Sequence, residues 1–349
     1  MSSYVQATPL GTYVQVENNP YVLGYKLSAW DRTNGCHLPS PVSMWCYPND
    51  LKWMPGDPIT LNIYINMSYD APLPTVSFYM MVENTGQVIL IDILTKEAGY
   101  NISRGYWYIQ GKQINPDGTS SQNPLVTLVQ AFTTFTLEPI MKDVNGNPAY
   151  VYGPVSIYAT ITTPGGVFTT KQVVGYKVYM LTRIANLQAS PNPAKAGQSV
   201  TMSGQLQRFA QDGQWIGVPG QQVCIDRLAQ SHSAFGPAYI MVEEACVETD
   251  GNGNFSATIT APSAPGTYTY YAIFNWNDNE LLGESWASTN LTVVQSTTPK
   301  PTTTPSTTTT TPTSTTIKPK LSAGDLAILL GGAGLLTGIV AYGVLKSNK

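Results

Sequence analysis

Apolar and polar residues alternate one for one in many short segments of this chain. The clearest segment is 59–66, where Ile59, Leu61, Ile63 and Ile65 alternate with Thr60, Asn62, Tyr64 and Asn66. Residues 155–161 and 255–261 show the same period. Period two sends successive side chains to opposite faces of a strand, so these segments predict β-strands with one buried face. Helical periodicity is absent from this part of the chain, which predicts an all-β body.

The strand pattern occurs twice along the chain. The sequence GDPITL at 56–61 resembles GQSVTM at 197–202, and DVNGN at 143–147 resembles DGNGN at 250–254. A late hairpin that begins at Gly153 has a counterpart that begins at Gly266. We therefore predict two tandem β-sandwich domains, residues 1–183 with insertions in the middle and residues 184–295.

The C-terminal part has a different composition. Residues 296–320 contain 16 Ser and Thr, 5 Pro and no acidic residue, which predicts a disordered stalk of the kind that carries O-linked sugars. Residues 326–345 are twenty uncharged, mainly apolar residues. As a helix they would cover about 30 Å, the thickness of a bilayer core, so we predict a single-pass transmembrane anchor within residues 321–349. A buried core helix is the alternative.

Small residues form a strip along that segment. Gly334 and Gly338 make a GxxxG pair, which lets a second membrane helix approach closely. We expect the protein to bind a lipid membrane through residues 326–345 and to self-associate through this strip. The alternative is that glycine is simply common in membrane helices.

Three segments of residues 187–295 are similar to Ig-like domains of prokaryotic surface proteins: SPNPAKAGQSVTMSG at 190–204, TDGNGNFSATITAPSAPGTYTYYAIF at 249–274 and STNLTVV at 288–294. The resemblance implies two Ig-like or jelly-roll-like β-sandwiches, with Tyr268 as a corner tyrosine at the start of the penultimate strand. The whole layout resembles archaeal surface proteins and virion proteins of archaeal viruses. It implies adhesion or scaffolding rather than catalysis, although such folds have many functions.

The cysteines and the sequons are the candidate modification sites. One pair of cysteines falls in each predicted domain, so we expect the disulfides Cys36–Cys46 and Cys224–Cys246, with free buried thiols as the alternative. N-glycosylation sequons begin at Asn66, Asn101, Asn254 and Asn290. The alternation places Asn66 and Asn290 on the outward phase of their strands, and Asn254 at a hairpin turn.

Composition and motifs give no catalytic chemistry to assign. Charged residues make up 11% of the chain, its formal net charge is −3, and it has only 2 histidines. These values disfavour a nucleic-acid partner and His-based metal chemistry, and no catalytic, cofactor-binding or metal-binding residue is predicted. The Asp143 and Asp250 segments begin like calcium loops, but they lack the later ligands, so we expect hairpin turns there. Aromatic side chains, namely Tyr106, Trp107, Trp276 and Trp286, could stack on sugars or belong to the core.

The sequence therefore predicts a non-enzymatic surface protein without a cofactor, whose body faces the exterior. The leading interpretation is a structural or attachment protein in the membrane of an archaeal virus, because residues 1–24 contain no secretory signal pattern. It would bind a glycan or a protein receptor on a host surface. The alternatives are an archaeal cell-surface protein, of the S-layer-associated or adhesion type, and a surface enzyme that processes glycans.

Overall fold

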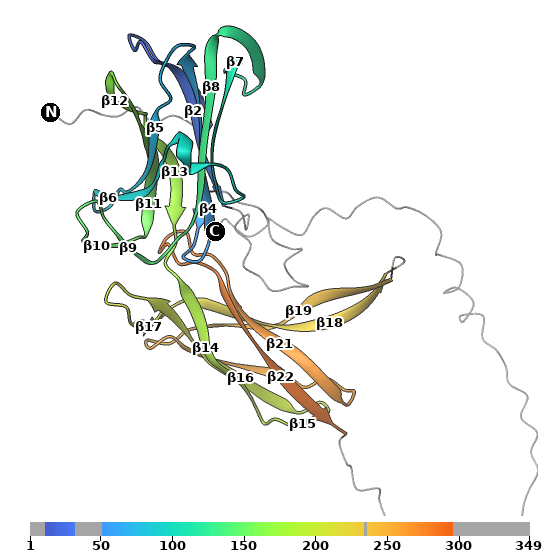
Figure 1. Cartoon of the computed structure of the whole chain (residues 1–349). Helices are drawn as coiled ribbons and strands as arrows, with labels where there is room; N and C mark the ends of the chain where they lie inside the picture. Colours follow the sequence, from blue (N-terminus) through green and yellow to red (C-terminus); the bar gives the residue numbers. More distant parts are fainter. Residues whose placement is uncertain (1–10, 32–50, 234–235, 296–349) are drawn as a thin grey trace, which may run out of the picture. The chain divides into compact units, whose positions relative to one another are not determined.

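The computed structural model describes residues 11–31, 51–233 and 236–295, which all belong to one compact unit, Met1–Thr297 (Figure 1). Apart from one 3₁₀ turn, η2 (Lys96–Ala98), the regular structure of these residues is entirely β, as predicted. Within the described ranges, no helix has the length and apolar character needed to cross a membrane. The predicted stalk, the predicted transmembrane helix, Cys36 and Cys46 lie outside the described residues.

The first half of the body contains two main sheets. One has the order β1 (Tyr13–Gln15), β2 (Val22–Asp31), β4 (Pro58–Ser68), β8 (Ser120–Thr136) and β7 (Arg104–Ile114). The other has the order β3 (Lys52–Trp53), β13 (Val173–Val178), β11 (Gly153–Thr163), β5 (Thr75–Val82) and β6 (Gln87–Leu94), and β12 (Gly166–Thr169) also pairs with β11. A separate hairpin joins β9 (Ile140–Lys142) to β10 (Pro148–Tyr150).

The second half repeats this plan with fewer strands. One sheet has the order β14 (Thr182–Ser190), β16 (Ser199–Phe209) and β17 (Trp215–Gly217), and β20 (Asn254–Thr260) also pairs with β16. The other has the order β15 (Ala194–Lys195), β22 (Ser285–Val294), β21 (Gly266–Phe274), β18 (Gln222–Ser233) and β19 (Gly236–Glu248).

Both halves have the strand order of an Ig-like sandwich. In each, a short strand runs parallel to the last strand, and one strand, β11 in the first half and β21 in the second, lies between the last strand and a hairpin from the middle of the half. The B, C, E, F and G positions of that fold are taken, in this order, by β4, β5, β8, β11 and β13 in the first half. In the second half the same positions are taken by β16, β18, β20, β21 and β22. The arrangement is Ig-like rather than jelly-roll-like.

The two glycine-led entry segments form the same turn. Gly56 and Gly197 both have positive φ, at 103° and 72°. Each donates its N–H to the residue just after the E strand, Leu137 in the first half and Ala261 in the second. These backbone bonds explain why GDPITL and GQSVTM resemble each other: each glycine turns the chain sharply into its B strand.

Two separate hydrophobic clusters fill the sandwiches. The first uses buried side chains between Val22 and Val178, and the second uses buried side chains between Ile184 and Val293. Strand β20 has the predicted pattern in full, because its alternate residues, Phe255, Ala257 and Ile259, are buried and the others are exposed. Each cluster lies between the inner faces of two sheets, so burial of apolar area supplies the main driving force for folding.

Strand β4 departs from the prediction of a single buried face. Asn62 and Asn66 are 4% exposed, although they alternate with the core residues. The amide of Gln130 donates to Asn62 Oδ1 at 2.7 Å, and Asn66 Nδ2 donates to the carbonyl oxygen of Ile114 at 2.8 Å. The side chain of Gln130 on the neighbouring strand β8 and the end of β7 at Ile114 therefore lie against this polar face, and these hydrogen bonds satisfy the buried amides.

Turns that begin with aspartate form in both halves but at different places. Asp143 accepts hydrogen bonds from the backbone N–H groups of Asn145 and Asn147, and Asp250 accepts them from Asn252 and Asn254. The first turn joins β9 to β10 in a hairpin, as expected. The second joins β19 to β20, which belong to different sheets, so the expected hairpin at Asn254 is wrong. The DxNGN motif that the two halves share forms the same local turn, but the two turns do not occupy equivalent positions in the fold.

Candidate functional site

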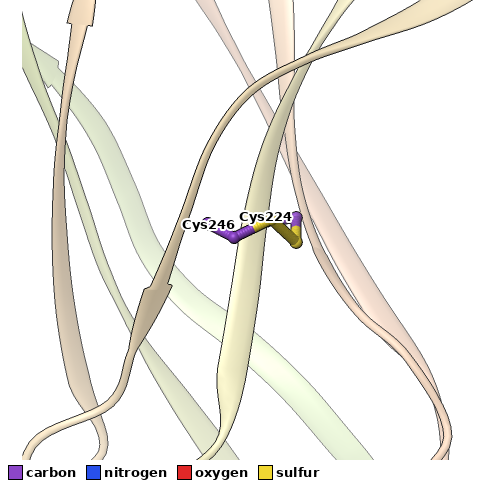
Figure 2. Close-up of a disulfide and its surroundings, with 2 residues drawn as sticks. All are labelled: Cys224 and Cys246. Carbon is purple, nitrogen blue, oxygen red and sulfur yellow. A yellow bond between two sulfur atoms is a disulfide. The ribbon is translucent and has the colours of Figure 1, made fainter. Parts of the chain in front are cut away.

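The Cys224–Cys246 disulfide links β18 to β19 (Figure 2). The two cysteines are register partners, with their Cα atoms 4.0 Å apart. This confirms the predicted pairing in the second half. Cys224, Cys246 and Glu243 also have ligand atoms close together, but both sulfur atoms are used by the disulfide, so this trio is not a metal centre.

Beyond the disulfide, β18 and β19 extend as a two-stranded arm (Figure 1). Strand β18 pairs with β21 only over Cys224–Arg227, whereas its pairing with β19 continues to Ser233. Tyr239 and Ile240 are exposed on this arm. His232 lies in β18, and His37 lies outside the described residues.

Exposed apolar side chains occur on the β7–β8 hairpin and in the loop that leads into it, and Tyr108 and Ile109, which are consecutive in β7, lie on opposite faces of the hairpin. We call this set the β7–β8 patch: Tyr100, Ile102, Tyr108, Ile109 and Leu125. Leu125 is 75% exposed and Ile102 is 79% exposed. Large contiguous apolar patches are typical of surfaces that contact another molecule, whereas single exposed apolar side chains are common on any protein.

An aromatic cluster supports one end of this patch. The ring of Tyr100 packs edge-on against Trp107 and Phe132, with centroid distances of 5.4 and 5.8 Å. Gly105 permits this packing, because a Cβ there would lie 2.2 Å from the ring of Phe132. Of the aromatics considered for sugar stacking, Tyr106 is buried and donates to Pro74 O, while Trp107 belongs to this cluster.

A second group of aromatic side chains, Tyr179 and Trp276, already has its contact partners within the protein. Asp278 accepts hydrogen bonds from Lys52 Nζ and from the Tyr179 hydroxyl, both at 2.6 Å, and these bonds hold the pKa of its carboxyl below the usual range. The ammonium of Lys52 also lies 5.5 Å from the ring centre of Trp276. Trp276 is therefore engaged in a cation–π contact, so it is poorly placed to stack on a ligand.

A depression of about 520 Å³ lies on the outer face of the sheet formed by β13, β11, β5 and β6. At its base, Tyr79 and Tyr158 are cross-strand partners with stacked rings, 4.9 Å apart and inclined by 10°. The wall is completed by Thr160, Thr169, Thr170 and Gln172 on one side and by Val88 and Val144 on the other. Val144 comes from the β9–β10 turn, whose N–H bond to Val88 O holds it against the sheet.

Sequence reasoning missed this depression. Tyr79 and Tyr158 stand on the outward phase of their strands, which is the only signal that the sequence contains. Their contact depends on the register between β5 and β11, which pairs residues 79 positions apart. Such a pairing cannot be read from local pattern.

The sequons fall in different environments. Asn101, Asn254 and Asn290 are exposed. The expectation that Asn66 faces outward to solvent is wrong, because its side chain is buried beneath Ile114 and Tyr13. Gly24, opposite Asn66 in the register, leaves the room that the Tyr13 hydroxyl occupies.

No protein-family model and no curated protein matches this chain. Among solved structures it is similar in part to the adhesin InvE of Yersinia pseudotuberculosis, at 13% identity and a TM-score of 0.24, over 76% of this chain and 60% of that one. It is similar to a tetra-tandem repeat in the extending region of a large adhesion protein, at 15% identity and a TM-score of 0.22, over 66% of this chain and 70% of that one. It is also similar to the ectodomain of mouse nectin-like molecule 4, at 14% identity and a TM-score of 0.19, over 68% of this chain and 60% of that one. At these TM-scores the likenesses carry no argument about function.

Proposed function

We propose that this chain is a non-enzymatic, membrane-anchored surface protein whose β-sandwiches make adhesive contacts with another surface. The observation that carries the proposal is the β7–β8 patch, whose five large apolar side chains are exposed on the two faces of the hairpin and in the loop before it. A soluble monomer gains nothing from exposing them, whereas burial of their area on contact would favour association. The apolar segment 326–345 would hold the protein in a membrane, and the Thr/Pro tract would act as its spacer.

In its specific form the proposal is a virion-surface attachment protein of an archaeal virus, and the alternative is an archaeal cell-surface protein. The layout of two β-sandwiches, a Thr/Pro-rich tract and a C-terminal apolar segment fits both. Mass spectrometry of purified virions beside membranes of the same host distinguishes them. Enrichment in virions supports the viral form, and recovery from membranes of uninfected cells supports the cellular form.

Adhesion is tested with the full chain in fluorescent phosphatidylcholine liposomes. The liposomes are mixed with intact archaeal cells, and retention is measured by flow cytometry. Replacing Ile109 and Leu125 by serine should reduce retention at least fivefold. The matched control replaces Val167 and Val294, two exposed valines outside the patch, by serine. Retention of the liposomes by the cells should then equal that of the parent protein.

Retention of the Ile109→Ser, Leu125→Ser variant at the parental level would show that the patch is not the adhesive surface. Retention no higher than that of protein-free liposomes would refute adhesion itself. A surface enzyme is tested separately, by incubating the chain with polysaccharide. New reducing ends would contradict the non-enzymatic part of the proposal.

A further inference from the structure

The Tyr79–Tyr158 depression has the chemistry of a ligand site, and it is distinct from the β7–β8 patch. Its lining side chains come from β5, β6, β11, β12, the segment between β12 and β13, and the β9–β10 turn. A volume of about 520 Å³ lies within the range of about 300–1,000 Å³ that is typical of small-molecule sites.

The polar groups in the depression have unused hydrogen-bonding capacity. Among the described residues, the hydroxyls of Tyr79, Tyr158, Thr160 and Thr169 make no hydrogen bond to protein. Thr170 is partly used, because its Oγ1 accepts the N–H of Ala159 at 2.9 Å. The amide nitrogen of Gln172 makes only a long contact to a sulfur, at 3.8 Å. A bound molecule with many hydroxyls could therefore find both donors and acceptors here.

The depression also lacks charge. The side chains that line it are tyrosine, threonine, glutamine and valine, with no acidic or basic group among them. A charged ligand would lose hydration on entering and gain no ion pair, so the lining favours a neutral ligand. This contrasts with the Asp278 cluster, whose aromatic rings already hold Lys52.

The two tyrosine rings cover one face of each other, so the apolar area that they offer a ligand is their outer faces and edges, next to those hydroxyls. Because the rings stack on each other and both side chains remain half-buried, little side-chain freedom is left to lose on binding. Aromatic area beside uncharged hydroxyl and amide groups matches a sugar ring, which has an apolar C–H face and a rim of hydroxyls.

We infer that the Tyr79–Tyr158 depression binds a neutral hexose oligosaccharide. A sugar ring lies against the tyrosine pair, and the hydroxyls of Thr160 and Thr169 with the amide of Gln172 contact its rim. The inference rests on the proposed function, because it names a ligand class for a surface protein. It uses residues that the adhesive patch does not, so the two can fail independently.

The test uses the full chain in lauryldimethylamine oxide micelles, a detergent without a sugar head group. Maltohexaose, cellohexaose, laminarihexaose and mannohexaose are titrated by saturation-transfer NMR and calorimetry, beside anionic hexagalacturonate. At least one neutral hexasaccharide should bind, and hexagalacturonate should not. Binding by none of the four, or by hexagalacturonate alone, would overturn the inference.

Variants locate the binding. Tyr158→Ala should weaken the affinity at least tenfold, and Thr160→Val, which keeps the shape of the side chain, should weaken it two- to fivefold. The control Tyr108→Ala removes an exposed strand tyrosine of the β7–β8 patch and should bind as the parent does. If circular dichroism shows that Tyr158→Ala is unfolded, the affinity of Thr160→Val tests the location of the site instead. Parental affinity of a folded variant at either position would refute this site.

Discussion

The hydroxyl of Tyr268 donates a hydrogen bond to the carbonyl oxygen of Ala264 at 2.9 Å. Tyr268 stands near the start of β21, and Ala264 lies in the loop just before that strand. The bond ties the loop to the strand, which is the arrangement of a tyrosine corner in Ig-like sandwiches.

Removing this hydroxyl should destabilise the second sandwich. Tyr268→Phe keeps the ring and loses one hydrogen bond, so we expect the free energy of unfolding to fall by about 1 kcal/mol. Urea denaturation followed by near-ultraviolet circular dichroism measures it. Tyr239→Phe, at an exposed position on β19, is the control and should change little. Equal stability of the two variants would show that the corner bond contributes nothing.

The Cys224–Cys246 disulfide should contribute substantially to stability. It closes a segment with a sequence separation of 22, for which the loss of chain entropy in the unfolded state predicts about 3 kcal/mol. Replacing both cysteines by serine should lower the free energy of unfolding by about that amount. Peptide mapping without reductant should find the 224–246 link and, as the sequence predicts, a 36–46 link. Free thiols, or links between the two pairs, would contradict the assignment.

The free energy of unfolding should fall as the pH rises through the mildly acidic range, because Asp226 ionises there in the folded state. Its Oδ1 is buried without a hydrogen bond within the described ranges, and burial, with Glu243 and Glu244 nearby, raises the pKa of its carboxyl to about 6. The folded state therefore holds this proton more tightly than the unfolded state, whose pKa is about 3.9, and the resulting stability is lost between about pH 4 and pH 6.

Replacing the Asp226 carboxyl by a neutral amide should remove that penalty. We expect Asp226→Asn to gain about 1 kcal/mol at pH 7, after allowance for the partial exposure of the side chain, and almost nothing at pH 3.5. Denaturant midpoints at both pH values measure this gain. Asp70→Asn, at an exposed turn after β4, should show no such difference. A gain that is the same at both pH values would contradict the role of ionisation.

Any N-linked glycan should be found on the exposed sequons and not on Asn66. The Nδ2 atom of Asn66 donates one N–H to Ile114 O and the other to the Tyr13 hydroxyl, so a sugar on Nδ2 would remove one of these donors and would need room that the packed groups occupy. Glycopeptide mass spectrometry of the native protein checks this. An occupied Asn66 in folded protein would show that the covering strands open.

Self-association should depend on the glycine strip of the apolar C-terminal segment. Close packing of backbones drives contact between membrane helices, so replacing Gly334 and Gly338 by leucine should weaken detergent-resistant oligomers. Leu329→Ala is the control and should leave them intact. Cross-linking of the double leucine variant at the parental level would assign any assembly to the β-sandwiches.

Local pattern predicted a large part of the fold. The alternation in 255–261 identified both the strand and its buried face, because β20 has one face on the core and the other in water. The segment GTYTYY identified the strand that begins at Gly266, and the resemblance to Ig-like domains implied the corner role of Tyr268. Both features depend on residues that are close together in the chain.

The sequence by itself determined the all-β class and a strand pattern that occurs twice, and it predicted the partner of Cys224. Period two and turn residues are local properties from which the strands follow, whereas the Ig-like plan was implied by the resemblance of residues 187–295 to Ig-like domains. Only the tertiary structure decided which polar faces stay in water. It placed Gln130 of β8 against Asn62 and Ile114 of β7 against Asn66, and it set the register that stacks Tyr79 on Tyr158. Alternation tells which side of a strand a residue takes, but what covers that side depends on segments that are far away in the chain.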